Sequence, residues 1–220
     1  MKFLDYGDQG LLVDFGDTVS QELNQEILDY CNLLREKNFP EIAYVIPTYN
    51  KLTVYFKSPL SDQNPVRNFL SSKNISLVSG KSKTIEIPAC FEPEFGLDIQ
   101  RIADYCNVTS HKLIDQFCSK PYYVYGYGFL PGMPKYGDTD FIAPKRLDKP
   151  RENVPKGSIG SVEKYCSVYT EQISGGWNII GRTPVKFFNK DSESPCLVNP
   201  GDLIQYFPVT SKEYKNYANN

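Results

Sequence analysis

Cationic side chains and tight turns concentrate in one part of this sequence, from Tyr125 to Pro184. The cations alternate there with glycine- and proline-rich turns and include Lys145, Arg146, Lys149, Arg151, Lys156 and Arg182. Arg182 follows Gly181 directly and precedes Thr183. Glycine lets the backbone approach a ligand, arginine offers a planar fork for carboxylate or phosphate, and threonine adds a hydroxyl. The spacing fits an anion-binding corner, and it equally fits a strand kink whose arginine pairs with a surface carboxylate.

Two other features of the stretch have alternative interpretations. Trp177, the only tryptophan, follows Gly175 and Gly176 and either fills the core or forms the wall of a pocket. Asp138 and Asp140 lie two positions apart in a turn. They are suited to acid–base chemistry or metal binding, although solvated turn residues are the simpler interpretation. The stretch is therefore a candidate binding region in which no catalytic residue can be named.

Several common catalytic arrangements are missing from the sequence. His111 is the only histidine and lies outside the glycine-rich stretch, which argues against a Ser-His or Cys-His nucleophile. There is no G-x-S-x-G elbow and no G-x-x-x-x-G-K-[ST] phosphate loop. The six cysteines are scattered without a C-x-x-C pair. We therefore expect reduced thiols rather than a disulfide framework, and no metal site.

The composition is that of an ordinary globular protein. Apolar residues make up 40% of the chain and charged residues 23%, and the formal net charge is −2. Such a charge gives no reason to expect nucleic acid as a partner, because nucleic-acid-binding proteins carry a basic footprint. No apolar run is long enough to cross a membrane, and the first residues lack the apolar centre of a signal peptide. We expect a cytoplasmic protein with no membrane partner.

The first part of the chain predicts a small α+β sandwich. Two short strands around a turn occupy residues 2–15, and a helix follows with Ser20 as its N-cap and its end near Asn38. Residues 41–47 and 51–57 alternate like paired strands. Asp62 can cap a short helix, and a strand at 83–88 completes the order β-β-α-β-β-α-β. Helices on one face of a mainly antiparallel sheet satisfy this order.

The second part begins near residue 88, in a proline-rich segment. Two short helices are expected there, one from Asp98 and one from Thr109 or Ser110. They resemble a DNA-reading helix-turn-helix in spacing, but the second helix has few basic groups, which favours a structural role. Short strands are then expected at 122–129, 140–144, 159–163, 166–170, 177–181, 184–188 and 203–207. So many short strands predict a closed or nearly closed β-barrel, and the polar tail from Ser211 is expected to fray.

Three sequence blocks of the glycine-rich stretch resemble those of a known family. They read G-F-L-P-G-M-P-K-Y-G, P-R-E-N-V-P-K-G-S-I-G and S-G-G-W-N-I-I-G-R-T, and N-P-G-D follows near the end of the chain. The blocks are similar to those of the family known as allophanate hydrolase subunit 1, KipI-like, or the B subunit of 5-oxoprolinase (PxpB), and the likeness extends over nearly the whole chain. It implies an α+β protein with a small α/β, ferredoxin-like N-terminal domain at 1–87 and a cyclophilin-like β-barrel domain at 88–220.

The resemblance also implies an activity and a partner. Family members of the 5-oxoprolinase type work with a PxpC-like (allophanate hydrolase subunit 2-like) subunit and use ATP as co-substrate to open 5-oxoproline to glutamate. A lactam is a poor electrophile, and phosphorylation of its oxygen would permit attack by water, in a site with cations and backbone donors. The residues we expect to bind the small amide or acid ligand are Gly128, Phe129, Pro131, Gly132, Arg151, Gly157, Ser158, Gly175, Gly176, Trp177, Gly181, Arg182 and Thr183.

The chain departs from the family pattern at several polar positions. A histidine and a glutamate usually precede the G-F-x-P-G block, where this chain has Phe117 and Pro121. A glutamine of the family corresponds to Tyr165, and a small residue of the second block to Lys156. Two alternatives to the enzyme subunit therefore stay open. One is a KipI-like inhibitor that binds a sensor histidine kinase, and the other is a ligand-binding barrel without catalysis.

Overall fold

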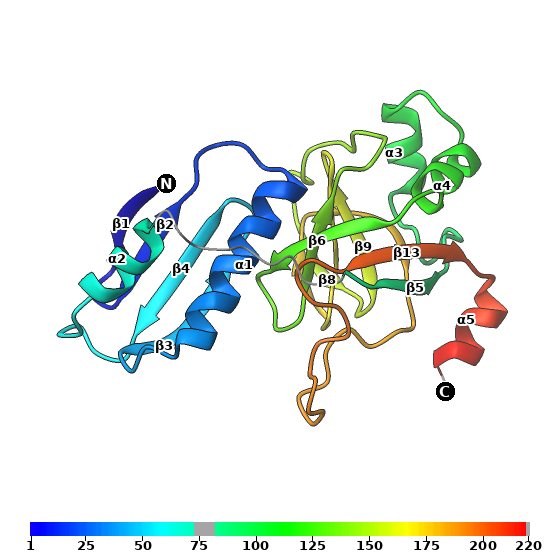
Figure 1. Cartoon of the computed structure of the whole chain (residues 1–220). Coiled ribbons are helices and arrows are strands. Elements are labelled where there is room, and N and C mark those ends of the chain that lie inside the picture. Colours follow the sequence, from blue (N-terminus) through cyan, green and yellow to red (C-terminus); the bar gives the residue numbers. More distant parts are fainter. Residues whose placement is uncertain (73–81, 219–220) are drawn as a thin grey trace. The chain divides into compact units, whose positions relative to one another are not determined.

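The computed structural model describes residues 1–72 and 82–218, and Figure 1 shows the chain. The chain divides into two compact units, residues 1–81 and residues 82–220, each with a sheet and a core of its own. Within the described residues, no helix is both long enough and apolar enough to span a bilayer.

The first unit is a four-stranded antiparallel sheet covered by two helices. Its elements are β1 (Lys2–Tyr6), β2 (Gly10–Asp14), α1 (Gln21–Lys37), β3 (Ile42–Pro47), β4 (Lys51–Phe56) and α2 (Asn64–Ser71), and the strand order is β1-β2-β4-β3. The Ser20 side chain accepts from the Leu23 N–H at the start of α1, and Asn38 ends the helix in the left-handed conformation. Alternate residues of β2 and β4 pack against α1 and form the core of this unit.

The last strand predicted for the first domain lies elsewhere. β5 (Thr84–Ala89) pairs in parallel with β13 (Leu203–Pro208), so it belongs to the second unit. Figure 1 shows the two strands side by side. The alternation of T-I-E-I-P indicates a strand but not its partner, because a parallel neighbour can come from any distance along the chain. The two units consequently divide after residue 81 rather than near residue 88.

The second unit is built on one seven-stranded sheet in the order β12-β9-β10-β7-β6-β13-β5. Its remaining strands are β6 (Tyr122–Tyr127), β7 (Pro134–Gly137), β9 (Ser158–Val162), β10 (Tyr165–Val168) and β12 (Asn178–Arg182). The two outermost strands meet just past the end of β5. The Cys90 N–H donates to the Arg182 carbonyl at 2.8 Å, and the Arg182 N–H donates to the Cys90 carbonyl at 2.9 Å. These two bonds bring the edges together, so the predicted nearly closed barrel is confirmed.

Five further elements complete the second unit. They are α3 (Ile99–Tyr105), α4 (Ser110–Cys118), the two-stranded ribbon of β8 (Arg151–Val154) and β11 (Ile173–Gly175), and α5 (Ser211–Ala218). Both short helices of the predicted pair are present. Ile102 of α3 and Leu113 of α4 are fully buried in the core of the barrel unit, so these helices cover the sheet with their apolar faces.

Some predicted elements of this unit are wrong. Residues 140–144 and 184–188 form no strand beyond isolated bridges at Ala143 and Phe188, whereas the three or four residues of β7, β8 and β11 do pair. The tail predicted to fray is α5. Thr210 and Glu213 cap it reciprocally: Glu213 Oε2 accepts from the Thr210 N–H at 2.8 Å, and Thr210 Oγ1 accepts from the Glu213 N–H at 3.3 Å. This T-x-x-E capping box is visible in the sequence.

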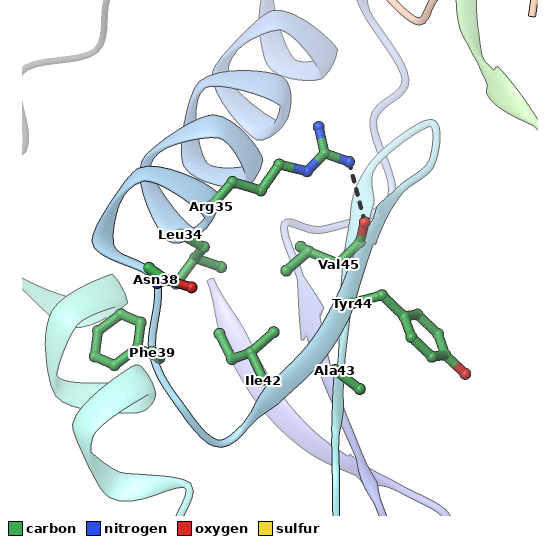
Figure 2. Close-up of a pocket in the computed structure, with 8 residues that line it drawn as sticks. All are labelled: Leu34, Arg35, Asn38, Phe39, Ile42, Ala43, Tyr44 and Val45. Carbon is green, nitrogen blue, oxygen red and sulfur yellow. Dashed lines mark hydrogen bonds between the residues drawn. The ribbon is translucent and has the colours of Figure 1, made fainter. Parts of the chain in front are cut away.

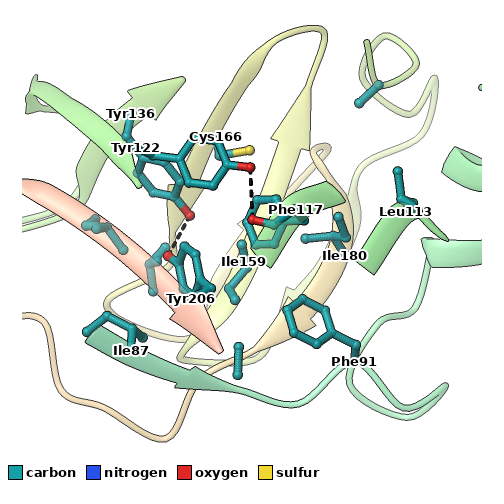
Figure 3. Packing of buried hydrophobic residues seen from close by; sticks show 14 of the residues in the cluster. Ile87, Phe91, Leu113, Phe117, Tyr122, Tyr136, Ile159, Cys166, Ile180 and Tyr206 are labelled. Atoms are coloured by element: carbon teal, nitrogen blue, oxygen red, sulfur yellow. Dashed lines mark hydrogen bonds between the residues drawn. The ribbon is translucent and has the colours of Figure 1, made fainter. Parts of the chain in front are cut away.

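Aromatic side chains fill the interior of the barrel (Figure 3). Phe117 stacks on Tyr122 and on Tyr206, with ring centroids 5.2 and 5.0 Å apart. The Tyr122 hydroxyl donates to the Phe117 carbonyl at 2.9 Å, and the hydroxyls of Tyr136 and Tyr206 lie 2.7 Å apart. The hydroxyls of Tyr122, Tyr136 and Tyr206 thus each have a partner, as is usual for buried polar groups. Because the interior is a packed core, a ligand site in this unit has to lie on the outside of the sheet.

Candidate functional site

Neighbouring strands place two different rows of side chains on the two faces of the barrel sheet. One row runs Tyr136, Cys166, Ser161 and Asn178 across β7, β10, β9 and β12, and Tyr136 and Cys166 belong to the core. The adjacent row runs Lys135, Ser167, Gly160 and Ile179. Since successive side chains of a strand point to opposite faces, the second row faces outward. Lys135 is therefore presented on the outer face of the sheet.

A cluster of polar and aromatic side chains gathers around Lys135. We call Lys135, Arg146, Ser167, Tyr169 and Trp177 the Trp177 cluster. Lys135 Nζ lies 4.8 Å from the centroid of the Trp177 ring, and the Arg146 guanidinium carbon lies 5.7 Å from it. Lys135 Nζ also donates to Ser167 Oγ at 3.3 Å, and Ser167 Oγ donates to the Pro134 carbonyl at 2.7 Å. Two cations thus share the ring of the only tryptophan in the chain.

Glycines of the signature blocks make room for this cluster. A Cβ at Gly160 would lie 3.1 Å from Trp177 Cβ, and a Cβ at Gly175 would lie 2.4 Å from the Tyr169 hydroxyl oxygen. At Gly128 it would lie 3.4 Å from Lys135 Cε, an ordinary contact. The tight turns predicted from the sequence therefore have a second role at Gly160 and Gly175, where any side chain would displace Trp177 or Tyr169.

Burial within the cluster disfavours the charged forms of Lys135 and Tyr169. Burial, and then the neighbouring Arg146, lower the pKa of Lys135 to about 8. Burial raises the pKa of Tyr169, while a hydrogen bond from the Trp177 backbone and the charges of Arg146 and Arg151 act in the opposite direction. Across the described residues, no carboxylate forms an ion pair with Lys135 or Arg146. The cluster therefore has an excess of positive charge.

A desolvated lysine should cost the protein stability. A pKa that falls from 10.5 to about 8 corresponds to at most about 3 kcal/mol at neutral pH. We predict that Lys135→Met raises the free energy of unfolding by about 1–3 kcal/mol at pH 7, measured by urea denaturation. Between the two pKa values the unfolded chain binds the extra proton, so the stability of the wild-type protein should rise with pH and the advantage of the variant should shrink. An equal advantage at pH 7 and pH 10 would contradict the assignment.

Arg151, which was expected to bind a ligand, is instead paired with Asp98 of the same chain. Its Nη2 donates to Asp98 Oδ1 at 2.7 Å, and Asp98 Oδ2 accepts from the Ile179 N–H at 2.7 Å. Asp98 is 6% exposed, so this is a largely buried ion pair. Arg151 Nη1 is buried without a partner. The pair ties the β8–β11 ribbon to the start of α3 and to β12.

The predicted anion-binding corner lies where the barrel closes. Arg182 stands over the Phe95 ring, with its guanidinium carbon 5.4 Å from the centroid, and its Nε is buried without a partner. Gly157 has φ +80°, and a Cβ there would lie 2.2 Å from the Thr183 carbonyl oxygen. A Cβ at Gly181 would lie 2.8 Å from the Phe91 ring. These glycines allow the strands to approach each other closely.

The two hydroxyl side chains of this corner differ in their hydrogen bonds. Ser158 Oγ is buried without a hydrogen-bond partner, whereas Thr183 Oγ1 accepts from the Val185 N–H at 3.2 Å. The contacts of Arg151 and Arg182 do not overlap, because the first binds Asp98 and the second packs on Phe95. Nine of the thirteen predicted residues therefore fall into two groups: Gly128, Gly175, Gly176 and Trp177 at or next to the Trp177 cluster, and Gly157, Ser158, Gly181, Arg182 and Thr183 at the barrel closure. Arg151 and the loop residues Phe129, Pro131 and Gly132 belong to neither group.

The G-F-L-P-G loop between β6 and β7 lies beside Lys135 and is held by contacts outside the Trp177 cluster. Phe129 has φ +76° and is 72% exposed. Pro131 is exposed, and its carbonyl accepts from Thr170 Oγ1 at 3.0 Å. Gly132 has φ +62°, and a Cβ there would lie 2.8 Å from the Phe188 side chain. The loop closes with a hydrogen bond from the Gly128 N–H to the Met133 carbonyl at 3.1 Å, immediately before β7 begins.

The positions that depart from the family pattern lie outside the Trp177 cluster. Phe117 is fully buried in the core, Pro121 is exposed before β6, and the Tyr165 ring lies under Lys164 Nζ at 5.6 Å. Lys156 forms an exposed ion pair with Glu171 at 2.7 Å. These four departures therefore leave the cations and the ring of the cluster unchanged.

The two turn aspartates have separate cationic partners. Asp138 accepts a hydrogen bond from Tyr125 and forms an ion pair with Lys164 at 3.4 Å, while Asp140 pairs with Lys120. In the described ranges, His, Cys, Asp and Glu side chains form no group of three or more that could hold a metal ion. The aspartates thus follow the simpler interpretation as turn residues.

The first unit contains a separate pocket of about 300 Å³ (Figure 2). It is lined by Leu34, Arg35, Asn38, Phe39, Ile42, Ala43, Tyr44 and Val45, from the end of α1 and from β3. Arg35 is the one cation of the lining, and its Nη2 donates to the Val45 carbonyl at 3.4 Å. Figure 2 shows the Tyr44 side chain directed away from Leu34 and Ile42. None of the residues predicted to bind a ligand lines this pocket.

Sequence reasoning named Trp177 and Arg146 but missed Lys135, Ser167 and Tyr169. Lys135 lies in P-G-M-P-K-Y-G, a segment taken as a turn because of its prolines and glycines. The alternation of half-buried Lys135 with buried Tyr136 is the signal that could have found it, since it places the lysine on the opposite face from a core residue.

Several known proteins are similar to this chain over most of its length. The B subunit of 5-oxoprolinase from Bacillus subtilis is 28% identical over 96% of this chain and 94% of its own length. The conserved uncharacterized protein PH0987 of Pyrococcus horikoshii is 32% identical, with a TM-score of 0.58 over 97% of this chain and all of that one. The crystal structure of TTHA0988 gives a TM-score of 0.80 at 23% identity, and this chain spans 40% of it.

The family assignment rests on a match to almost the whole sequence. The family model described as carboxyltransferase domain, subdomain C and D, matches residues 1–198. This range includes both compact units up to the loop before β13, and with it every residue of the Trp177 cluster and of the barrel closure. The chain therefore belongs to the carboxyltransferase domain, subdomain C and D, family, in the KipI-like group that includes the B subunits of 5-oxoprolinases.

Proposed function

We propose that this chain is a subunit of an ATP-dependent amidohydrolase that resembles 5-oxoprolinase. The reaction would convert 5-oxoproline, ATP and water to glutamate, ADP and phosphate, together with a PxpC-like partner subunit in the cytoplasm. One observation carries the proposal: the match to the B subunit of the Bacillus subtilis 5-oxoprolinase spans nearly the full length of both chains. A shared domain alone would match only part of such a relative.

The chemistry explains the need for ATP and for cations. The lactam carbon of 5-oxoproline is a poor electrophile, and transfer of the γ-phosphoryl group of ATP to the lactam oxygen would turn that oxygen into a leaving group. A first water would then attack the carbon and break its bond to the ring nitrogen, which becomes the amine of glutamate and leaves an acyl phosphate. A second water would split the acyl phosphate into the carboxylate and free phosphate. Positive side chains stabilise the phosphoryl group and the developing negative charge. Lys135 and Arg146 supply such charges, and Arg151 and Arg182 each keep a buried nitrogen without a partner.

The finer features of the fold form part of the same proposal. Starting from β2, the first unit has the order β-α-β-β-α, and β1 stands beside β2 where the last strand of a ferredoxin-like sheet would be. We propose a ferredoxin-like sheet whose last strand has moved to the N-terminus. The second unit corresponds in the proposal to a cyclophilin-like barrel, supported by the sheet that the Cys90–Arg182 bridge closes.

The proposal predicts partner-dependent catalysis. The chain would be co-expressed with a PxpC-like subunit, purified as a complex and assayed for ADP release with and without 5-oxoproline. We expect a stable complex and ADP release that depends on 5-oxoproline, with neither subunit active alone. The matched control is Lys156→Gln, which removes an exposed ion pair and should leave the rate unchanged.

Two outcomes would contradict the proposal. A stable complex that releases no ADP with any lactam tested would exclude the lactam-opening reaction. Failure to bind the PxpC-like partner, combined with inhibition of a sensor histidine kinase, would support the KipI-like alternative. One feature favours keeping that alternative in the test: β3 is an edge strand and exposes Tyr44 and Ile46, and uncovered apolar edges suit protein partners.

A further inference from the structure

We propose that the Trp177 cluster binds the anionic group of a small ligand, a carboxylate or a phosphate, through Lys135 and Arg146, with the Trp177 ring against the body of the ligand. This deepens the proposed function and rests on it for the choice of 5-oxoproline as a probe. The site lies on the outer face of the barrel sheet, between Lys135 of β7 and Trp177, which stands between β11 and β12.

The positive charge of the cluster is not balanced by carboxylates. Lys135 and Arg146 lie 4.8 and 5.7 Å from the same ring, and within the described part of the chain neither has a carboxylate partner. The other lysines and arginines that form ion pairs here do so at exposed or half-buried positions, such as Lys120, Lys156 and Lys164. Like charges near one ring repel each other, and a bound anion reduces that repulsion.

The surrounding residues hold the cluster in place. Ser167 is fully buried and accepts from Lys135 Nζ at 3.3 Å, which orients the ammonium group. The absence of a Cβ at Gly160 and Gly175 fixes where Trp177 and Tyr169 can lie. The buried pair of Asp98 and Arg151 anchors the ribbon from which Trp177 follows. A lysine that only covered the surface would need none of these supports.

Lys135 is mainly protonated at neutral pH. Burial and Arg146 lower the pKa of Lys135 to about 8, so most of it carries a proton at neutral pH. The titratable and charged groups that face it are Arg146 and, next to Arg146, Tyr169 and Arg151. A bound anion favours the protonated form and therefore raises the pKa of Lys135. Binding should hold steady below pH 8 and weaken as the pH rises above it.

The shape of the cluster favours a flat ligand with one anionic end. An indole face packs well against a planar ring or amide, while the two cations take the charge. A cyclic amide acid such as 5-oxoproline has both parts. Inorganic phosphate has only the anion, and 2-pyrrolidinone has only the ring. These three compounds separate a carboxylate ligand from a phosphate ligand and from simple apolar contact.

The experiment uses Trp177 as its own reporter. Because it is the only tryptophan, fluorescence excited selectively at tryptophan reports this cluster alone. We would titrate the protein with 5-oxoproline, inorganic phosphate and 2-pyrrolidinone at pH 7. We expect saturable binding of at least one of the two anions and at least 10-fold weaker binding of 2-pyrrolidinone. Tighter binding of 5-oxoproline identifies a carboxylate site, and tighter binding of phosphate a phosphate site.

Variants distinguish a built site from general charge. Lys135→Met and Arg146→Gln should each weaken the anion at least 10-fold, as expected for the loss of a charged hydrogen bond. Lys135→Arg should retain binding and lose the weakening above pH 8. Lys156→Gln is the matched control for net charge and should bind like the wild type. The near-ultraviolet circular dichroism of each variant would confirm that the fold is kept.

The outcomes that overturn the inference are separate from those that overturn the proposed function. No saturable fluorescence change with either anion, or equal affinity in Lys135→Met and the wild type, would refute the anion site. Anion binding that depends on Lys135, together with an inactive complex, would refute the lactam-opening function and leave the site in place. An active complex whose rate is unchanged by Lys135→Met would retain the function and remove this cluster from it.

Discussion

Asp98→Ala will lower the free energy of unfolding of the second unit by about 3–5 kcal/mol. The substitution leaves the half-buried Arg151 without its carboxylate and the Ile179 N–H without its acceptor. Removing one partner of a buried ion pair costs this much because the remaining charge stays desolvated. Trp177 fluorescence during urea denaturation reports this unit, and the midpoint should move to lower urea without a change in slope.

The control for this prediction is the exposed pair of Lys156 and Glu171. Its N···O distance is the same 2.7 Å, but both side chains are open to water. Glu171→Ala should therefore cost less than about 1 kcal/mol. Asp98→Asn, which keeps an oxygen acceptor for Ile179, should fall between the two. If Asp98→Ala and Glu171→Ala proved equally mild, the buried pair would not anchor the ribbon as described.

Phe117→Ala will destabilise the same unit by about 3–5 kcal/mol. Its ring is fully buried and contacts the rings of Tyr122 and Tyr206 at the centre of the core (Figure 3). Truncation would leave a cavity and remove the stacked contacts of both tyrosines. The measurement is again the urea midpoint, and Phe129→Ala is the matched control, because that ring is 72% exposed and should change stability by less than about 0.5 kcal/mol.

The Phe117 result also tests how the departure from the family pattern is understood. If Phe117 is a core residue, Phe117→His should destabilise as well, because an imidazole there would need a hydrogen-bond partner in an apolar environment. A histidine variant as stable as the wild type would show that this position can hold a polar group. In that case the departure would concern a ligand site rather than the core.

Periodicity and capping signals predicted most of the local structure. Ser20 caps α1 as expected, because an N-cap depends only on neighbouring residues, and α4 begins at Ser110 within the predicted range. Asp62 was wrong as the cap of α2, whose N-cap is Gln63 without a side-chain hydrogen bond. The partner of β5 was not predictable, because parallel pairing with β13 joins distant parts of the chain. The closure at Cys90 and Arg182 was hidden for the same reason. Strands as short as Ile173–Gly175 give too few residues for an alternation to be recognised.

The sequence predicted the region of the candidate site but not all of its residues. The glycine- and proline-rich blocks located Trp177 correctly within a structured region, since turns of this kind fix the backbone. Arg151 was expected to meet a ligand, yet a buried aspartate, distant in sequence, holds one side of its guanidinium. Lys135 was overlooked because a lysine in a turn-rich segment is ordinarily solvated. Only the pairing of β7 with β10 places its side chain against Trp177 and Ser167.

The central claim is that the chain contributes an anion-binding cluster to a lactam-opening complex. The most direct measurement is ADP release by the reconstituted complex with 5-oxoproline, for the wild type, Lys135→Met and Lys156→Gln. The account predicts release that depends on 5-oxoproline for the wild type and Lys156→Gln, and at least 10-fold less for Lys135→Met at subsaturating substrate. Equal rates for all three proteins, or an intact complex that releases no ADP, would contradict it.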